Sequence, residues 1–190
     1  AARLGKSLLE LGGNNAIIIT PDANLDIALR AAVFGAVGTC GQRCTSTRRL
    51  IVHADCFETV KNKLIKAYQQ IRIGDPLDAN NHVGPLIDAQ AVEQYSKALQ
   101  AVEEQGGEWI VEGGVLKGSD YKSGCYVKPA VASLSNDAAI VQQETFAPIL
   151  YLIRYEGGVE QAITIQNDVK QGLSSSIITN NLQEAEGFLS

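Results

Sequence analysis

The chain has 190 residues, of which 45% are hydrophobic and 19% are charged, a composition that is typical of a folded globular domain and excludes an intrinsically disordered chain. The formal net charge is -5, so no general positive field favours a nucleic-acid partner. Apolar runs are too short to cross a bilayer and residues 1–15 carry no secretory signal, so we also expect no membrane partner.

The predicted elements of the first half of the chain alternate between strand and helix. Residues 16–20 form a β-branched run between turn residues, which predicts a buried strand. Asn24 is placed to cap a helix from residue 25 to about residue 38, because apolar side chains recur there at helical spacing. Residues 49–53 indicate a second strand, and the helical spacing that follows stops before Gly74.

The second half of the chain continues this alternation. Its predicted helices cover residues 88–105, 158–168 and 182 onwards, and its predicted strands cover residues 109–111, 148–153 and 174–179. Pro129 interrupts an apolar stretch at residues 126–131, which favours an edge strand or an extended connection. Strands that alternate with helices are typical of parallel sheets. We therefore expect one α/β domain with a mostly parallel sheet covered by helices.

The cysteines indicate a reducing compartment. Disulfide-stabilised secreted domains are mostly small and rich in cysteine. This chain has only four cysteines at uneven spacing, namely Cys40, Cys44, Cys56 and Cys125. We therefore expect a cytoplasmic protein with reduced thiols.

Cys44 is the first candidate for chemistry. Small residues surround it, and Arg43, Arg48 and Arg49 lie within five positions. Nearby cations favour the thiolate, which is the nucleophilic form of cysteine. The alternative is a small buried apolar residue, since most free cysteines are of that kind.

A metal site is a third interpretation of the same cysteine. It would use Cys40 and Cys44 together with His53 or His82. The chain has no C-x-x-C pair and the intervals do not match a zinc ribbon or finger. We therefore predict no metal site.

Two glutamates are further candidates. Glu10 precedes a Gly-Gly turn within an apolar stretch, and a buried carboxylate there would have a raised pKa suited to a general base. Glu144 and Phe146 come just before an apolar strand, where a carboxylate and an aromatic ring suit a sugar hydroxyl pair and a planar ring. The alternatives are an exposed glutamate beside a turn and an ordinary core phenylalanine.

Taken together, three segments resemble the aldehyde dehydrogenase superfamily in order and spacing. These are Glu10-Leu-Gly-Gly13, Gly41-Gln-Arg-Cys44 and Glu144-Thr-Phe-Ala-Pro148. The resemblance extends over essentially the whole chain, and its details look most like the antiquitin branch, family 7. Members of that branch oxidise α-aminoadipic semialdehyde in lysine breakdown.

The resemblance implies a role for each matching residue. Cys44 would be the nucleophile, and Glu10 would be the base that activates the hydrolytic water. NAD is the implied cofactor, with Glu144 on the nicotinamide ribose and with Phe146, Leu11 and Gly12 around the nicotinamide. An aldehyde is the implied substrate, with Arg43 and Thr45 as the candidate substrate-binding residues.

The chain contains no methionine, not even at its start, which suggests a removed start or a piece of a longer protein. The resemblance implies that residues 1–190 are the catalytic domain, without most of the NAD-binding domain and without the C-terminal segment. Such a fragment would be folded but inactive, and the full-length protein would be a homo-oligomer, either a dimer or a tetramer. The alternatives are a CoA-acylating or phosphorylating relative, which the presence of Glu10 disfavours, and a non-catalytic crystallin-like or scaffold derivative.

Overall fold

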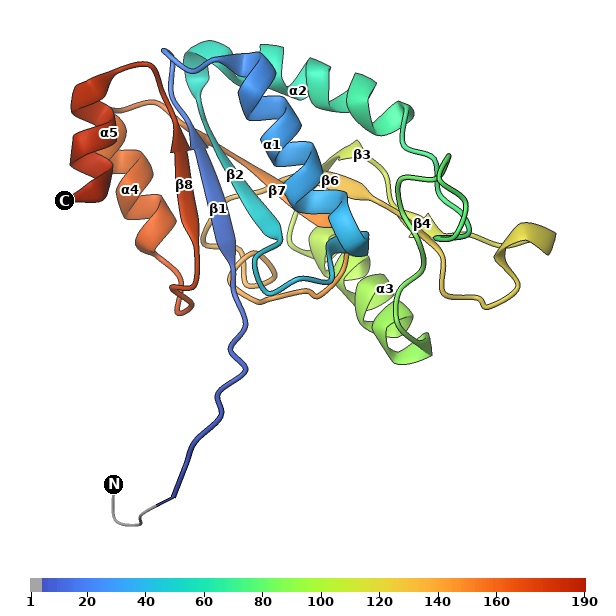
Figure 1. Ribbon diagram of the computed structural model, residues 1–190. Coiled ribbons are helices and arrows are strands. Elements are labelled where there is room, and N and C mark those ends of the chain that lie inside the picture. Colours follow the sequence, from blue (N-terminus) through green and yellow to red (C-terminus); the bar gives the residue numbers. More distant parts are fainter. Residues whose placement is uncertain (1–4) are drawn as a thin grey trace.

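A computed structural model describes residues 5–190, so residues 1–4 of the expected domain lie outside the described part (Figure 1). Its main feature is a six-stranded sheet with the order β3-β6-β7-β2-β1-β8. Neighbouring strands are parallel, except that β3 runs antiparallel to β6. These strands are β1 (Asn15–Ile19), β2 (Thr47–His53), β3 (Glu108–Val111), β6 (Ala130–Ser133), β7 (Ile149–Tyr155) and β8 (Ser175–Ile178).

The helices confirm the expected α/β class, because they cover the sheet. They are α1 (Leu25–Val37), α2 (Ala54–Gln69), α3 (Ala89–Glu104), α4 (Val159–Asn167) and α5 (Leu182–Leu189). The step from β1 to β2 and the step from β7 to β8 cross the sheet in opposite directions, so right-handed connections place α1 and α4 on opposite faces. No helix in residues 5–190 is long and apolar enough to cross a membrane.

The central strands form the middle of the core. Every residue of β1 is buried, and so are six of the seven residues in both β2 and β7. Strands that helices cover on both faces have apolar side chains pointing both ways, which explains the uninterrupted runs at Ile17–Ile19 and Leu50–Val52.

Helix α1 begins where the sequence predicted. The Asn24 side chain accepts hydrogen bonds from the backbone of Asp26 at 3.1 Å and of Ile27 at 3.2 Å, as an N-cap residue does. The buried face of α1 carries small side chains, namely Ala28, Ala32 and Ala36. These alanines leave room for the helix to lie close to the sheet.

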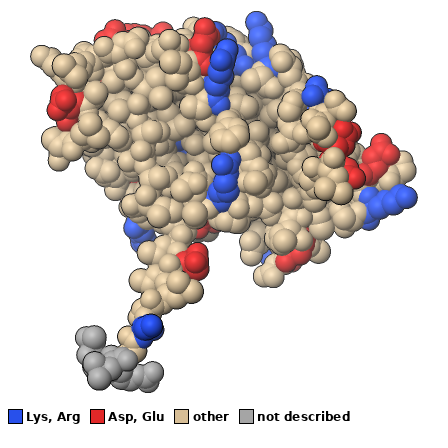
Figure 2. Space-filling model, viewed as in Figure 1, with Lys and Arg blue, Asp and Glu red and all other residues tan. Residues whose placement is uncertain are grey.

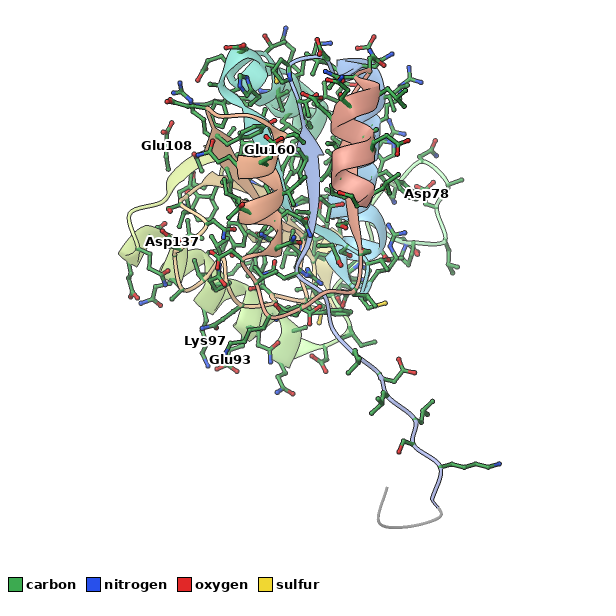
Figure 3. All side chains as sticks on the ribbon, turned by 90° about the vertical axis from the view of Figure 1, so that its left-hand side faces the viewer. Asp78, Glu93, Lys97, Glu108, Asp137 and Glu160 are labelled. Atoms are coloured by element: carbon green, nitrogen blue, oxygen red, sulfur yellow. The ribbon has the colours of Figure 1, made fainter. Side chains whose placement is uncertain are left out.

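Most charged side chains lie on the outside of the molecule, but Arg48 and Arg49 on β2 are buried. In the view of Figure 2 acidic and basic residues are scattered over the surface rather than gathered in one basic patch. Glu93 and Lys97 form a 2.7 Å ion pair on the exposed side of α3 (Figure 3). Such an exposed pair contributes little to stability.

The edge-strand interpretation of residues 126–131 is correct for residues 127–128, which lie in a separate two-stranded sheet, and wrong for residues 130–131. Pro129 separates two short strands: β5 (Val127–Lys128) pairs with β4 (Gly114–Val115), whereas β6 lies inside the main sheet between β3 and β7. A central strand is possible because the proline precedes β6. The first N–H after it, that of Ala130, donates to the carbonyl of Pro148 at 2.9 Å.

The three segments with candidate residues meet at one edge of the sheet. They are residues 10–14, 41–46 and 142–148, and each comes just before a strand, namely β1, β2 and β7. These strands are parallel neighbours. Their amino ends therefore lie side by side and bring the preceding loops together.

A left-handed turn leads from α1 into the loop before β2. Thr39, Cys40 and Gly41 have φ values of 52°, 54° and 67°. A left-handed conformation costs a residue with a side chain about 1 to 2 kcal/mol. Gly41 also packs tightly, because a Cβ atom there would lie 2.5 Å from the backbone carbonyl of Ala147. Only glycine satisfies both conditions at this position.

Gly41→Ala is expected to lower the free energy of unfolding by about 2 to 4 kcal/mol, since it adds backbone strain and an overlap with Ala147. Urea denaturation of this chain would measure the loss. Gly106→Ala is the matched control, because Gly106 has a φ of 77° but open space around the position of its Cβ atom. Equal losses in the two variants would contradict the close approach at Gly41.

Candidate active site

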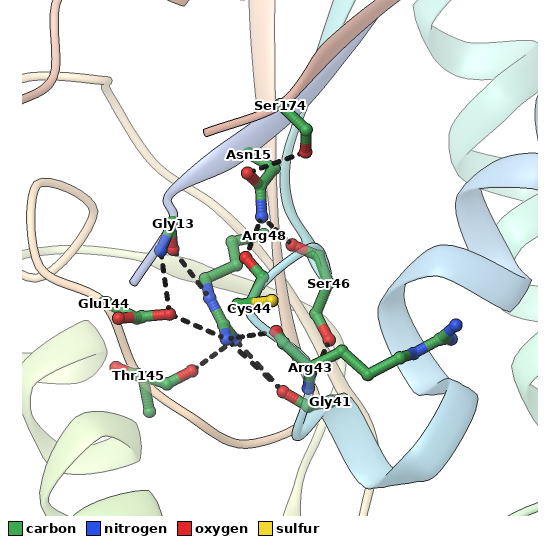
Figure 4. Close-up of polar contacts among 10 residues, drawn as sticks. All are labelled: Gly13, Asn15, Gly41, Arg43, Cys44, Ser46, Arg48, Glu144, Thr145 and Ser174. Atoms are coloured by element: carbon green, nitrogen blue, oxygen red, sulfur yellow. Dashed lines mark hydrogen bonds and ion pairs between the residues drawn. The ribbon is translucent and has the colours of Figure 1, made fainter. Parts of the chain in front are cut away.

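Cys44 lies exposed at the meeting point of the three loops (Figure 4). The loop that carries it is fixed from β1, because Asn15 Nδ2 donates to the carbonyls of Cys44 and Ser46, both at 2.8 Å. Ser174, just before β8, donates to Asn15 Oδ1 at 2.8 Å. In the described part of the chain the Cys44 N–H has no partner, so it is free to donate to an oxyanion.

Two glycines allow the first loop to approach the other two. A Cβ atom at Gly12 would overlap the carboxylate of Glu144, and one at Gly13 would lie 2.5 Å from the carbonyl oxygen of Cys44. The Gly13 N–H donates to Glu144 Oε1 at 3.1 Å. The Gly-Gly pair therefore keeps Cys44 and Glu144 within reach of the same backbone.

Glu144 is held on one side and free on the other. Its Oε1 atom accepts from Gly13 and forms a 3.3 Å ion pair with Arg48 Nη2. Its side chain is 22% exposed, and Oε2 has no hydrogen-bond partner in residues 5–190. Phe146 is 40% exposed nearby. The arrangement thus presents one free carboxylate oxygen and one open aromatic face to a ligand.

The side chains of the three arginines near Cys44 in the sequence point in different directions. Arg43 points towards Phe34, with its guanidinium carbon 4.9 Å from the ring centre. Arg49 points to the opposite side of β2. Its guanidinium donates twice to the carbonyl of Asn14, at 3.1 and 3.0 Å. Arg48 alone is turned towards the nucleophile loop (Figure 4).

The local sequence alone does not predict which of the three arginine side chains points towards Cys44. Burial lowers the pKa of Arg48, while the nearby Glu144 carboxylate and Cys44 oppose that shift. Burial also lowers the pKa of Arg49, to about 10. Alternation along β2 sends these neighbouring side chains to opposite faces of the sheet.

Glu10 and Leu11 lie in an exposed segment, residues 5–12, that extends away from the sheet (Figure 1). The structure therefore agrees with the alternative of an exposed glutamate beside a turn and not with a buried carboxylate. The apolar residues beside Glu10 are themselves exposed, with Leu9 at 73% and Leu11 at 65%, so they provide no low-dielectric surrounding.

Arg43 lies beside a groove of about 660 Å³ between α1 and α2. Arg43 Nη2 donates to the carbonyl of Phe34 at 3.3 Å, and Phe34 and Gly38 both line the groove. Within residues 5–190 no carboxylate pairs with Arg43. Thr45 is exposed next to Cys44.

The metal interpretation finds no support in the geometry. In residues 5–190 no group of three or more His, Cys, Asp or Glu side chains is placed to hold a metal ion. Cys40 is buried while Cys44 is exposed. Burial raises the pKa of the Cys40 thiol to about 12, which disfavours the thiolate that a metal would need.

Iodoacetamide at pH 8 is expected to alkylate Cys44 first. Cys40 should react at least about a hundredfold more slowly, because burial both blocks access and suppresses its thiolate. Burial also raises the pKa of Cys56. Mass spectrometry of peptides from the folded chain, with the urea-unfolded chain as the control, would give the order. Labelling of Cys44 no faster than that of Cys56 or Cys125 would contradict the activated-thiolate interpretation.

The fold brings together Cys44 and Glu144, which the sequence motifs indicated. Asn15, Ser174 and the distinct role of Arg48 were not predicted from the sequence. The one available signal for Asn15 was its place directly after Gly-Gly and at the start of a buried strand. A polar side chain there must find a partner inside the protein.

Comparison with known proteins identifies relatives along the whole chain. A model of the aldehyde dehydrogenase family matches residues 1–190. The chain is 48% identical over 181 residues to alpha-aminoadipic semialdehyde dehydrogenase of Mus musculus, covering 95% of this chain and 33% of that protein. It is 45% identical over 177 residues to aldehyde dehydrogenase family 7 member A1 of Pisum sativum, covering 93% of this chain and 34% of that protein.

Solved structures share the fold. Betaine aldehyde dehydrogenase of Staphylococcus aureus in complex with NAD+ has a TM-score of 0.90 and 26% identity, over 95% of this chain and 36% of that chain. Lactaldehyde dehydrogenase of Escherichia coli has a TM-score of 0.88 and 32% identity, over 95% of this chain and 37% of that chain. The chain thus spans about a third of the length of the relatives it matches.

Proposed function

Since this chain belongs to the aldehyde dehydrogenase family, we propose that residues 1–190 are the cysteine-bearing catalytic domain of an NAD-dependent enzyme that oxidises aldehydes to carboxylic acids. The observation that carries the proposal is the exposed Cys44 thiol, in a loop that Arg48 joins to the Glu144 carboxylate (Figure 4). The complete enzyme would be a cytoplasmic homo-oligomer, either a dimer or a tetramer. Free cysteines are in keeping with that compartment.

In the proposed reaction the Cys44 thiolate adds to the aldehyde carbon and forms a C–S bond. The carbonyl oxygen becomes an oxyanion, and the free N–H of Cys44 donates to it. Bound NAD would supply the hydride acceptor, and loss of the hydride from the former aldehyde carbon would leave a thioester on Cys44. Glu10 then takes a proton from water, the resulting hydroxide attacks the thioester carbon, and the Cys44 thiolate leaves with release of the acid.

The residues present fit the nicotinamide end of NAD. Glu144 Oε2 is free to accept from a ribose hydroxyl, and Phe146 offers an open ring face beside it. The backbone of Gly12 borders the same carboxylate, and we propose that Leu11, the residue before it, also borders the nicotinamide. We propose that the adenosine half of NAD is bound by the rest of the enzyme.

We propose α-aminoadipic semialdehyde as the substrate, which combines an aldehyde with a charged far end. Arg43 supports this choice, because its guanidinium lies beside the groove between α1 and α2 without a carboxylate partner in the described residues. A guanidinium binds a carboxylate with two parallel hydrogen bonds. Thr45, exposed beside Cys44, would contact the reacting end.

The test is turnover of α-aminoadipic semialdehyde by the complete enzyme, followed as NADH absorbance, with hexanal as an aldehyde of similar length that lacks the charged end. We expect a clear preference for the semialdehyde, and Arg43→Met should remove most of it. Equal turnover of both aldehydes would overturn the substrate proposal alone. Tight NAD binding with aldehyde turnover by residues 1–190 alone would overturn the proposed need for the rest of the enzyme.

A further inference from the structure

A single buried guanidinium joins the three loops of the site. Arg48 is 2% exposed, and its Nε atom donates to the carbonyl of Gly13 at 3.3 Å. Its Nη1 and Nη2 atoms each reach the carbonyl of Gly41 at 3.4 Å, and Nη2 also donates to the carbonyl of Arg43 at 3.3 Å. One side chain therefore holds the loop before β1 and the loop that carries Cys44.

The same guanidinium also holds the third loop. It donates to the carbonyl of Thr145 at 2.5 Å and pairs with Glu144 Oε1 at 3.3 Å. Its central carbon lies 5.2 Å from the ring centre of Phe146, within the range of a cation–π contact. Both residues that face the proposed cofactor site thus take their position from Arg48.

We infer that Arg48 is a positioning residue, which fixes Glu144 and Phe146 against the loop that carries Cys44 and so sets where the nicotinamide end of the cofactor lies. The inference rests on the proposed function. Because Arg48 and Gly13 occupy Oε1 of Glu144, Oε2 is left for the ligand. Arg48 covers one face of the Phe146 ring, and the side chain is still 40% exposed for a ligand.

Lysine cannot do the same. A guanidinium has five N–H donors in a rigid planar fork, whereas an ammonium is a point charge with three donors. Arg48→Lys retains the charge but cannot reach the carbonyls of Gly13, Gly41 and Thr145 and the carboxylate of Glu144 together. We therefore expect the lysine variant to fold and to lose the fixed arrangement of the loops.

Arg49 provides a matched control. It is 0% exposed and is as extensively hydrogen-bonded as Arg48, but its partners are Asn14, Asn136, Ile165 and Gln166. Arg49→Lys should therefore cost stability to a similar degree without touching Glu144 or Phe146. An effect common to both variants reports a loss of stability. An effect confined to Arg48→Lys reports a changed position of Glu144 and Phe146.

The first measurement uses this chain alone and needs no cofactor. The chain has four phenylalanines, so ring-labelled ¹³C-Phe gives a simple NMR spectrum in which Phe146→Leu identifies the Phe146 signals. Arg48→Lys is expected to shift or broaden these signals, and Arg49→Lys should leave them in place. Unchanged Phe146 signals in folded Arg48→Lys would overturn the inference.

The second measurement uses the complete enzyme. Arg48→Lys is expected to raise KM for NAD about tenfold, in line with the loss of one charge-assisted hydrogen bond, and to leave KM for the aldehyde within about twofold. In the double variant with Glu144→Gln, KM for NAD should rise by less than the product of the two single effects, because the two residues act as a unit. An unchanged KM for NAD in an enzyme that turns over normally would overturn this inference alone. Absence of aldehyde oxidation by the unsubstituted enzyme would overturn the proposed function.

Discussion

Cys44→Ala is expected to abolish NAD-dependent aldehyde oxidation by the complete enzyme, with kcat falling by at least about a thousandfold. The proposed hydride transfer starts from an adduct with a C–S bond, and alanine has no atom that can form it. The side chain is exposed, so its truncation should leave no cavity and should cost little stability. NADH formation under saturating substrate, together with thermal unfolding of the variant, would measure both quantities.

Cys125→Ala is the control for this experiment. Cys125 is also a free and partly exposed cysteine, but it lies in the loop before β5, and its hydrogen-bond partners are Ser123 and Leu86 rather than residues of the three loops. Its replacement should leave turnover unchanged. Residual oxidation by Cys44→Ala at more than a few per cent of the normal rate would refute the assignment of the nucleophile.

Glu10→Gln is expected to separate the two halves of the reaction. Thioester formation needs no base for water, so one equivalent of NADH should form per active site in a burst. Hydrolysis should then slow by on the order of a hundredfold to ten-thousandfold, the usual contribution of a general base. Intact-mass spectrometry should detect the acyl group on Cys44, and added hydroxylamine should release it.

Glu108→Gln is the control, since Glu108 is an exposed carboxylate on β3 that pairs with Lys61 at 3.2 Å. It should show neither a burst nor an acyl adduct. Steady turnover without a burst in Glu10→Gln would contradict the proposed role of Glu10. Because Glu10 lies on an exposed segment of this chain, the experiment also tests whether the complete enzyme brings that carboxylate to Cys44.

The local sequence was sufficient for most of the secondary structure. The N-cap at Asn24 and the β-branched run of β1 depend on neighbouring residues only, and both elements begin within one residue of their predicted positions. The Pro129 prediction failed for residues 130–131 because a proline excludes a central strand only where its missing N–H faces a partner. Here it falls between β5 and β6.

The motifs of the sequence also indicated the candidate site residues. Cys44 and Glu144 stand in segments whose order along the chain matches the family, and the fold places them beside the same Gly-Gly turn. The sequence could not determine the direction of a side chain. The sequence does not distinguish the three arginines near Cys44. In the structure Arg43 packs on Phe34, Arg48 joins the loops, and Arg49 donates to the carbonyl of Asn14.

Tertiary structure alone decided how the site is built, because its three loops come from distant parts of the chain. Gly13 and Glu144 are separated by 131 positions and are joined by a 3.1 Å hydrogen bond. That contact exists because β1, β2 and β7 are parallel neighbours whose amino ends share one edge. The sequence by itself therefore determined the elements and the chemical groups. Strand order and the buried guanidinium of Arg48 decided their arrangement, since hydrogen bonds between loops depend on proximity in space and not on spacing along the chain.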